Sequence, residues 1–181
     1  MSLLTKIFVI MRHYVINSSR LFVFLLAISS LISCNEPDID ACRDGNCTTT
    51  YSENSQVVEI ANEDWLQLNV TDGNQVVFKY EYNYDDEELI ADDELTELLY
   101  FQVPSNRDEF TIEASFFETH KVYFNRVCFC VKLGFEHPSS GTITGKKLDA
   151  NRWQVSADLS INYYGPEDPL RLIFDHVFTR N

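Results

Sequence analysis

Basic residues are scarce in this sequence of 181 residues. It holds 14 lysines and arginines against 28 aspartates and glutamates, which gives a formal net charge of −14 at pH 7. A surface of this charge repels polyanions, so the composition excludes nucleic acid as a partner held by general electrostatic attraction. The hydrophobic content of 45% and the aromatic content of 13% exclude a mainly disordered chain.

Long apolar runs and catalytic motifs are also missing. No hydrophobic stretch is long enough for a polytopic membrane protein, and no GxxxxGK[ST], GxGxxG, GxSxG or HExxH motif occurs. His120, His137 and His176 are isolated in sequence from one another. Asp175 precedes His176, but neighbours in a strand point to opposite faces, which argues against a catalytic dyad. The sequence therefore predicts no catalytic residue, no metal site and no cofactor.

Residues 1–33 have the properties of an export signal. They contain three basic residues and no acidic residue, and they end in an apolar stretch over residues 21–32. As a helix this stretch would span only about 18 Å, against a hydrocarbon core of about 30 Å. The segment is therefore interpreted as a cleaved signal peptide rather than a membrane span. Its long basic head leaves open whether translation starts at Met1 or at Met11.

The end of this segment, Leu31-Ile32-Ser33-Cys34, resembles the lipobox of bacterial lipoproteins. An aliphatic residue stands three positions before the cysteine and a small residue stands directly before it. The resemblance covers residues 1–34 only. It implies that the signal is cut before Cys34, that the cysteine thiol receives a diacylglyceryl group, and that the protein lies in the cell envelope. By resemblance to lipoprotein sorting signals, the absence of Asp at position 35 favours the outer membrane.

The chain after the cut is still more acidic. Residues 34–181 keep 11 of the basic residues and all 28 acidic ones, a net charge of −17. Anionic lipid repels such a body, so attachment to the membrane depends on the acyl chains, each buried CH₂ contributing about 0.8 kcal/mol. We divide the chain into a signal peptide (1–33), a lipidated tether (34–55) and a β-sandwich domain (56–181).

The pattern after the tether has a period of two residues. Between residues 75 and 84, aromatic side chains alternate with mostly polar ones, which indicates a strand with one apolar face. Two hairpins are predicted, one of residues 66–70 with 75–84 around a turn at 71–74, and one of 141–148 with 153–163 around 149–152. Further strands are predicted at 57–60, 97–103, 110–115, 122–124, 128–135 and 170–178.

About nine strands with short connections predict an all-β fold, either an antiparallel β-sandwich or a small barrel. The segment 85–94 holds seven acidic residues and is expected to be an exposed loop. It has no EF-hand spacing and no glycine at the sharp turn, so a solvated loop is favoured over a calcium site.

Four cysteines follow Cys34, an even number, which in an exported protein makes Cys42, Cys47, Cys128 and Cys130 disulfide candidates. In a strand, alternate Cα atoms lie about 6.6 Å apart, so a bond between Cys128 and Cys130 would be strained. Crosslinks from Cys42 and Cys47 to this second pair are favoured over a local Cys42–Cys47 loop. A four-thiolate zinc site is the alternative, which lacks paired CxxC knuckles.

Two classes of function remain open. We favour a non-enzymatic binding or interaction module on a lipid anchor, with an unknown protein or glycan as its ligand. The alternative is a lipid-anchored hydrolase whose carboxylates are brought together only by the fold. The cysteine pattern, together with residues 141–145 and Trp153, resembles small exported lipoproteins of undefined function. That resemblance implies no activity.

Overall fold

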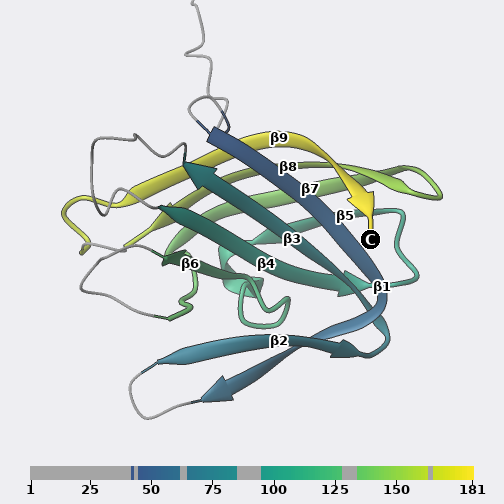
Figure 1. Cartoon of the computed structure of the whole chain (residues 1–181), viewed down its shortest axis with the longest axis horizontal. Helices are drawn as coiled ribbons and strands as arrows, with labels where there is room; N and C mark the ends of the chain where they lie inside the picture. Colours follow the sequence, from purple (N-terminus) through teal and green to yellow (C-terminus); the bar gives the residue numbers. More distant parts are fainter. Residues whose placement is uncertain (1–41, 43–44, 62–64, 85–94, 128–133, 163–164) are drawn as a thin grey trace, which may run out of the picture. The chain divides into compact units, whose positions relative to one another are not determined.

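The computed structural model of the chain describes residues 42, 45–61, 65–84, 95–127, 134–162 and 165–181 (Figure 1). These residues form an all-β fold with nine strands and one short 3₁₀ helix. The fold class predicted from the sequence is thereby confirmed. Within the described ranges, no helix has the length and apolar character needed to cross a bilayer.

The strands follow one another along the chain with mostly short connections. They are β1 (Gly45–Ala61), β2 (Leu66–Asp72), β3 (Gln75–Tyr84), β4 (Thr96–Pro104), β5 (Glu109–Glu113), β6 (Tyr123–Val127), β7 (Ser140–Asp149), β8 (Arg152–Ile161) and β9 (Leu170–Arg180), with the 3₁₀ helix η1 (Ala114–Phe116) after β5. Their hydrogen-bonded order is β5-β7-β8-β9-β1-β3-β4-β6, and β2 pairs with β1 outside this path.

Two four-stranded layers result from this order. Neighbouring strands are antiparallel except β9 and β1, which run parallel and pair only at Thr50 with Thr179 and at Tyr51 with Arg180. This brief contact connects the layer β5-β7-β8-β9 to the layer β1-β3-β4-β6 (Figure 1). Buried side chains from both layers form one hydrophobic cluster, so the two layers pack face to face as a sandwich.

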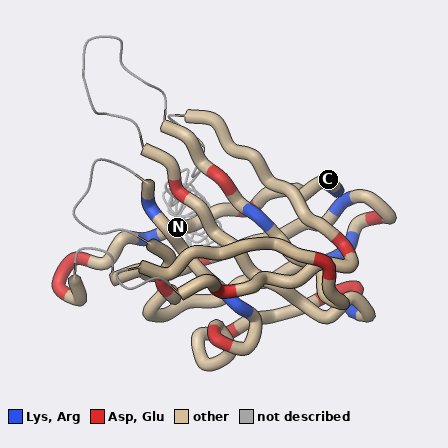
Figure 2. The backbone as a smooth tube through the Cα atoms, turned by 60° about the horizontal axis from the view of Figure 1, so that its bottom comes forward, with Lys and Arg blue, Asp and Glu red and all other residues tan. Residues whose placement is uncertain are grey.

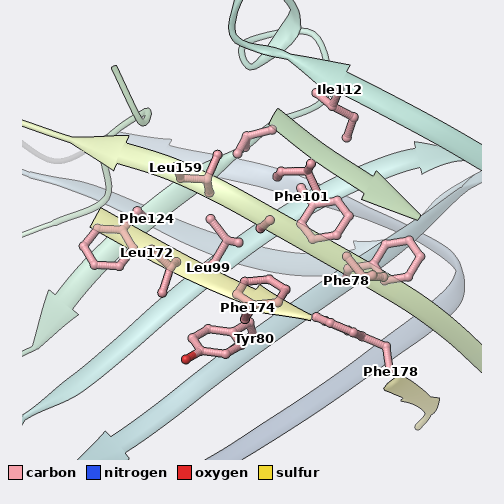
Figure 3. Packing of buried hydrophobic residues seen from close by; sticks show 14 of the residues in the cluster. Phe78, Tyr80, Leu99, Phe101, Ile112, Phe124, Leu159, Leu172, Phe174 and Phe178 are labelled. Atoms are coloured by element: carbon pink, nitrogen blue, oxygen red, sulfur yellow. The ribbon is translucent and has the colours of Figure 1, made fainter. Parts of the chain in front are cut away.

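The core between the layers is mainly aromatic. The Phe78 ring stacks on Phe101 with 4.7 Å between ring centroids, and meets the edge of Trp153 at 5.5 Å. The Tyr80 ring stacks on Phe174 of the opposite layer at 4.6 Å (Figure 3). Such stacked and edge-on pairs stabilise a core beyond the area that they bury. The alternating aromatics of β3 thus face the core, as their period of two predicts.

The first predicted hairpin is wrong. β1 has an irregularity between Ser52 and Ser55, where Asn54 has a positive φ of 52°, and its pairing partner changes there. The part before the irregularity pairs with β3, and the part after it pairs with β2. Ser55 lies opposite both Asp72 and Gln75, so β2 and β3 lie end to end along β1 and do not pair side by side.

The second predicted hairpin is confirmed. β7 and β8 pair in register from Ser140–Ser160 to Asp149–Arg152. The strands predicted at 97–103, 122–124 and 170–178 overlap β4, β6 and β9.

Three other predictions differ from the structure or lie partly outside the described residues. The strand predicted at 110–115 ends at Glu113 and continues as η1. Residues 128–133 of the strand predicted at 128–135 lie outside the described residues. β1 begins at Gly45, within the range assigned to the tether, because this polar segment finds backbone partners along β3.

A second, smaller cluster lies on the outer side of β3, β4 and β6. Val57, Val77 and Tyr123 are buried there, with four partly buried neighbours: Leu66, Leu68, Tyr100 and Phe135. The end of β1 and all of β2 form a hairpin apart from the two main layers (Figure 1). We call these residues the hairpin cluster, because they attach the β1–β2 hairpin to the sandwich.

Candidate functional site

The structure describes only some of the residues that the sequence singles out. Cys34, Cys128 and Cys130 lie outside the described residues, as does the acidic segment 85–94. Trp65, which directly precedes β2, is 41% exposed. The signal peptide and the lipidation site therefore remain predictions.

Cys42 and Cys47 form a disulfide with each other, and their Cα atoms are 5.6 Å apart. The favoured crosslinks from these two cysteines to Cys128 and Cys130 are therefore wrong, and the local loop is the observed arrangement. Closing a loop between thiols five positions apart costs much less chain entropy than closing one of 80 residues or more. The nearby thiol is thus the better partner.

The outer surface of the layer β5-β7-β8-β9 is polar and hollowed. Its strands place side chains in rows across the sheet: Thr111 lies opposite Thr144, Thr144 opposite Ser156, and Ser156 opposite Asp175. The outward residues of these strands that line hollows form what we call the polar face: Glu109, Thr111, Ser140, Thr142, Thr144, Lys146, Gln154, Ser156, Asp158, Ser160, Arg171, Asp175 and one apolar member, Ile173.

Three shallow hollows adjoin along the polar face, with volumes of about 650, 390 and 460 Å³. The first and second share Thr144 and Ser156, and the second and third share Thr142 and Asp158. They therefore form one continuous depression across β7 and β8. It exists because hydroxyl side chains in the middle strands are short and leave space above the backbone.

The carboxylates of the polar face are held by hydrogen bonds. Ser156 Oγ donates to Asp175 Oδ1 at 2.7 Å and Gln154 Nε2 donates to the same oxygen at 2.5 Å. These bonds, that from Ser156 first, lower the pKa of Asp175. Arg171 donates to both oxygens of Asp158 at 2.9 and 3.1 Å, and lowers the pKa of that carboxyl group. Both groups are therefore ionised at neutral pH and are poor general acids.

A carboxyl group with a raised pKa lies elsewhere. Glu97 is 8% exposed on the inner side of β4, and burial raises its pKa although the ion pair with Arg126, at 3.1 Å, acts against the shift. It lies in the other layer from Asp158 and Asp175. Acidic and basic residues also stand interspersed over the described backbone (Figure 2). Of these three described carboxyl groups, the one with a raised pKa therefore lies apart from the two with lowered pKa values.

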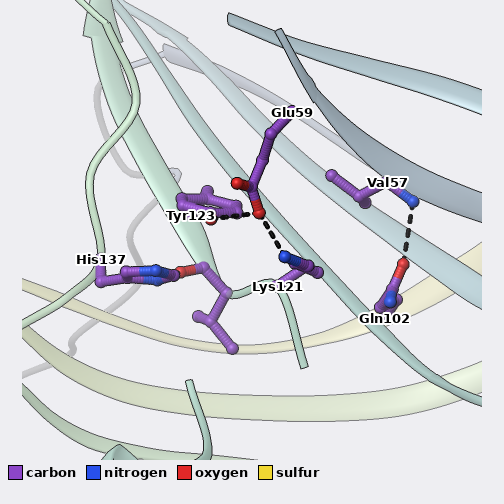
Figure 4. A network of polar contacts seen from close by, with 7 residues as sticks. Val57, Glu59, Gln102, Lys121, Tyr123 and His137 are labelled. Carbon is purple, nitrogen blue, oxygen red and sulfur yellow. Dashed lines mark hydrogen bonds and ion pairs between the residues drawn. The ribbon is translucent and has the colours of Figure 1, made fainter. Parts of the chain in front are cut away.

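A network of polar contacts attaches the hairpin (Figure 4). The Glu59 carboxylate accepts hydrogen bonds from Lys121 Nζ and, at 2.6 Å, from Tyr123 Oη. The bond from Lys121, then that from Tyr123, lowers the pKa of Glu59, and burial raises the pKa of Tyr123. The His137 ring stacks on Tyr123 at 4.2 Å, and its Nδ1–H donates to the Val122 carbonyl at 2.7 Å. Glu59 of the hairpin is thereby connected to Lys121 and Tyr123 outside it.

His176 was not expected at a site, but it lies against the disulfide. Its Nε2 is 3.1 Å from Cys42 Sγ, and the ligating atoms of Cys42, Cys47 and His176 all lie within 4.8 Å of one another. The His176 ring also stacks near Phe174, at 5.7 Å between centroids. The inward direction of the His176 side chain could have been predicted from the sequence, because His176 alternates in phase with the buried Phe174 and Phe178 along β9. Asp175 points outward, as strand geometry predicts.

No protein-family model, curated protein or solved structure matches this chain.

Proposed function

We propose that this chain is a lipid-anchored lipoprotein of the bacterial cell envelope, in the outer membrane, whose β-sandwich is a non-enzymatic binding module. The lipobox at Cys34 supports the anchor, and the net charge of −17 after the cut disfavours electrostatic attachment to anionic lipid, so that attachment is assigned to acyl chains. The proposal of binding rests on the polar face, because one continuous depression crosses it.

The first and third hollows have mainly polar linings, which suit a glycan better than an apolar ligand, whereas Ala157, Ile173 and Phe174 contribute apolar surface to the middle hollow. Hydroxyl groups of Thr142, Thr144 and Ser156 both donate and accept hydrogen bonds, as sugar hydroxyls do. The Asp175 carboxylate is oriented by two donors on one oxygen and keeps acceptor capacity for ligand hydroxyls. An open, shallow depression also accommodates a chain of sugar units, whereas a small apolar ligand needs an enclosing pocket.

Binding is tested with the full chain in detergent against an array of envelope oligosaccharides, including peptidoglycan fragments, followed by calorimetry on positive members. Ser156→Phe fills the middle of the depression and is expected to weaken binding at least tenfold. Asp175→Asn removes an ionised acceptor and is also expected to weaken binding. Gln67→Phe, on the exposed side of the hairpin, is the matched control and should leave affinity unchanged.

Two results would contradict the binding proposal. One is an array without a positive oligosaccharide, in which case a protein ligand becomes the better hypothesis. The other is equal affinity of the Ser156→Phe and Gln67→Phe variants, which would place the ligand outside the polar face.

The anchor is tested separately. A Cys34→Ala variant is expected to lose labelling by a palmitate analogue and to keep its signal peptide or be processed elsewhere. Cys42→Ala is the matched control, because it removes a thiol without touching the lipobox. Unchanged labelling of the Cys34→Ala variant would defeat the proposed anchor, whatever the outcome of the glycan array.

A further inference from the structure

Three potential metal ligands meet at the start of β1. Cys42 and Cys47 belong to the N-terminal end of the described chain, whereas His176 lies 134 positions after Cys42 in β9. Their ligating atoms lie within 4.8 Å of one another. Two thiolates and an imidazole are a ligand set that Zn²⁺ accepts, with the fourth position left to water or another ligand.

The imidazole is already aimed at the sulfur. Its ring packs in a stack with Phe174 and with Tyr80, at 5.7 and 6.3 Å between centroids, which fixes the plane in which Nε2 points. Zn–S bonds of about 2.3 Å and Zn–N bonds of about 2.0–2.1 Å place sulfur and nitrogen about 3.5 Å apart around a tetrahedral ion. The Cys42 Sγ to His176 Nε2 distance of 3.1 Å is within a few tenths of that separation.

We propose that Cys42, Cys47 and His176 form a zinc site in the reduced protein, and that the disulfide and the zinc ion exclude each other. A dithiol reductant transfers two electrons and two protons to the disulfide, so that the S–S bond breaks, two thiols form and the reductant becomes a disulfide. Binding of Zn²⁺ then releases the two thiol protons, because thiolates are the ligands.

The disulfide and the zinc ion connect different parts of the chain. The disulfide closes only the short loop between residues 42 and 47, within one end of the chain. A zinc ion bound also by His176 joins this end to β9, which is in the other four-stranded layer from β3 and β4. Zinc is therefore expected to raise the melting temperature of the reduced protein and to leave that of the oxidised protein unchanged.

The experiment uses the full chain in detergent, reduced and then freed of reductant without oxygen. Co²⁺ is titrated in and read by its thiolate charge-transfer absorption, and Zn²⁺ is then added to displace it. His176→Gln is compared with His120→Gln, because His120 donates to the Gln102 carbonyl and is not part of the cluster. A Cys42→Ser, Cys47→Ser double variant is compared with a Cys128→Ser, Cys130→Ser double variant.

The expected result is one thiolate-bound ion in the reduced wild type and in both controls. His176→Gln should bind zinc at least tenfold more weakly, and the Cys42→Ser, Cys47→Ser variant should lose the charge-transfer band. Equal affinity of His176→Gln and His120→Gln, or loss of the band in the Cys128→Ser, Cys130→Ser variant, would overturn the proposal.

A second measurement needs no variant. Zn²⁺ should protect Cys42 and Cys47 of the reduced wild type from alkylation by iodoacetamide, with the modified sites located by mass spectrometry. Protection confined to other cysteines, or a zinc-dependent rise in melting temperature that is equal in the oxidised protein, would also overturn the site.

Discussion

The two sides of the layer β1-β3-β4-β6 are stabilised by different kinds of contact. On the inner side, Phe78 and Phe101 stack within a cluster that includes rings from the opposite layer. On the outer side, the fully buried members of the hairpin cluster among the described residues are Val57, Val77 and Tyr123. The remaining attachment of the hairpin consists of hydrogen bonds and an ion pair.

This difference indicates which side of the layer should tolerate substitutions. Apolar burial contributes roughly in proportion to area and depends little on pH, whereas a partly exposed ion pair contributes little and only while both groups are charged. The inner side should therefore determine whether the domain folds. The outer side should determine how firmly the hairpin is held, and should respond to pH.

Phe78→Ala is the change expected to have the largest effect. Phe78 is fully buried and touches rings in both layers, so its loss leaves a cavity and should lower the free energy of unfolding by about 3–5 kcal/mol. Val77→Ala, next in sequence but on the outer side, should cost about 2 kcal/mol or less. Urea denaturation measures both, and equal losses would break the comparison between the two sides.

Removal of the disulfide should have the next largest effect, at the edge of the inner core where Cys47 packs. Closing the loop 42–47 stabilises by about 2 kcal/mol in the chain-entropy model. With a chelator present, a Cys42→Ser, Cys47→Ser variant should therefore melt at a lower temperature than the wild type. Added reductant should lower the melting temperature of the wild type more than that of the variant. Equal melting of the wild type with and without reductant would contradict a structural role.

Gln102→Ala tests the outer side. Gln102 Oε1 accepts a hydrogen bond from the backbone N–H of the buried Val57 at 2.8 Å, and its loss leaves that donor without the acceptor, at a cost of about 1–2 kcal/mol. Amide hydrogen exchange should become faster in the β1–β2 hairpin while β8 stays protected. Gln154→Ala on the polar face is the control, and equal acceleration in β8 would show that the hairpin is not an independent unit.

Much of this division could be predicted from the sequence. Alternation in β8 assigns Trp153 and Val155 to the core and Gln154 and Ser156 to the outside, because side chains in a strand follow a strict period of two. The same parity identifies the hydroxyl-lined rows of the polar face once the register is known. The hollows themselves could not be predicted, since they depend on which strands are neighbours.

The wrong hairpin prediction has a cause in the tertiary structure. The hairpin of residues 66–70 with 75–84 is predicted from local spacing, but the pairing depends on the path of β1. Its irregularity at Asn54 assigns β2 and β3 to successive parts of one strand. Strand alternation predicts that His176 points inward, but its approach to Cys42 depends on tertiary packing across 134 positions.

Glu59→Gln should have the smallest effect and the clearest pH dependence. The Glu59 side chain is about one-third exposed and bonds to Lys121 and Tyr123, so the pair should contribute less than about 1 kcal/mol near neutral pH. Its hydrogen bonds hold the pKa of Glu59 below the ordinary value of 4.5. The folded state therefore binds this proton more weakly than the unfolded state. The stabilisation is present above the ordinary pKa and is lost as pH falls through the lowered one.

Hydrogen exchange of the hairpin amides, and the melting temperature, should thus differ between wild type and Glu59→Gln at about pH 7 and converge at about pH 3. Glu109→Gln makes the same change of charge on β5, in the other four-stranded layer, and controls for net charge. A difference that persists unchanged at low pH would mean that the Glu59 carboxylate acts through packing and not through its charge. The outer side would then be held in the same way as the inner side.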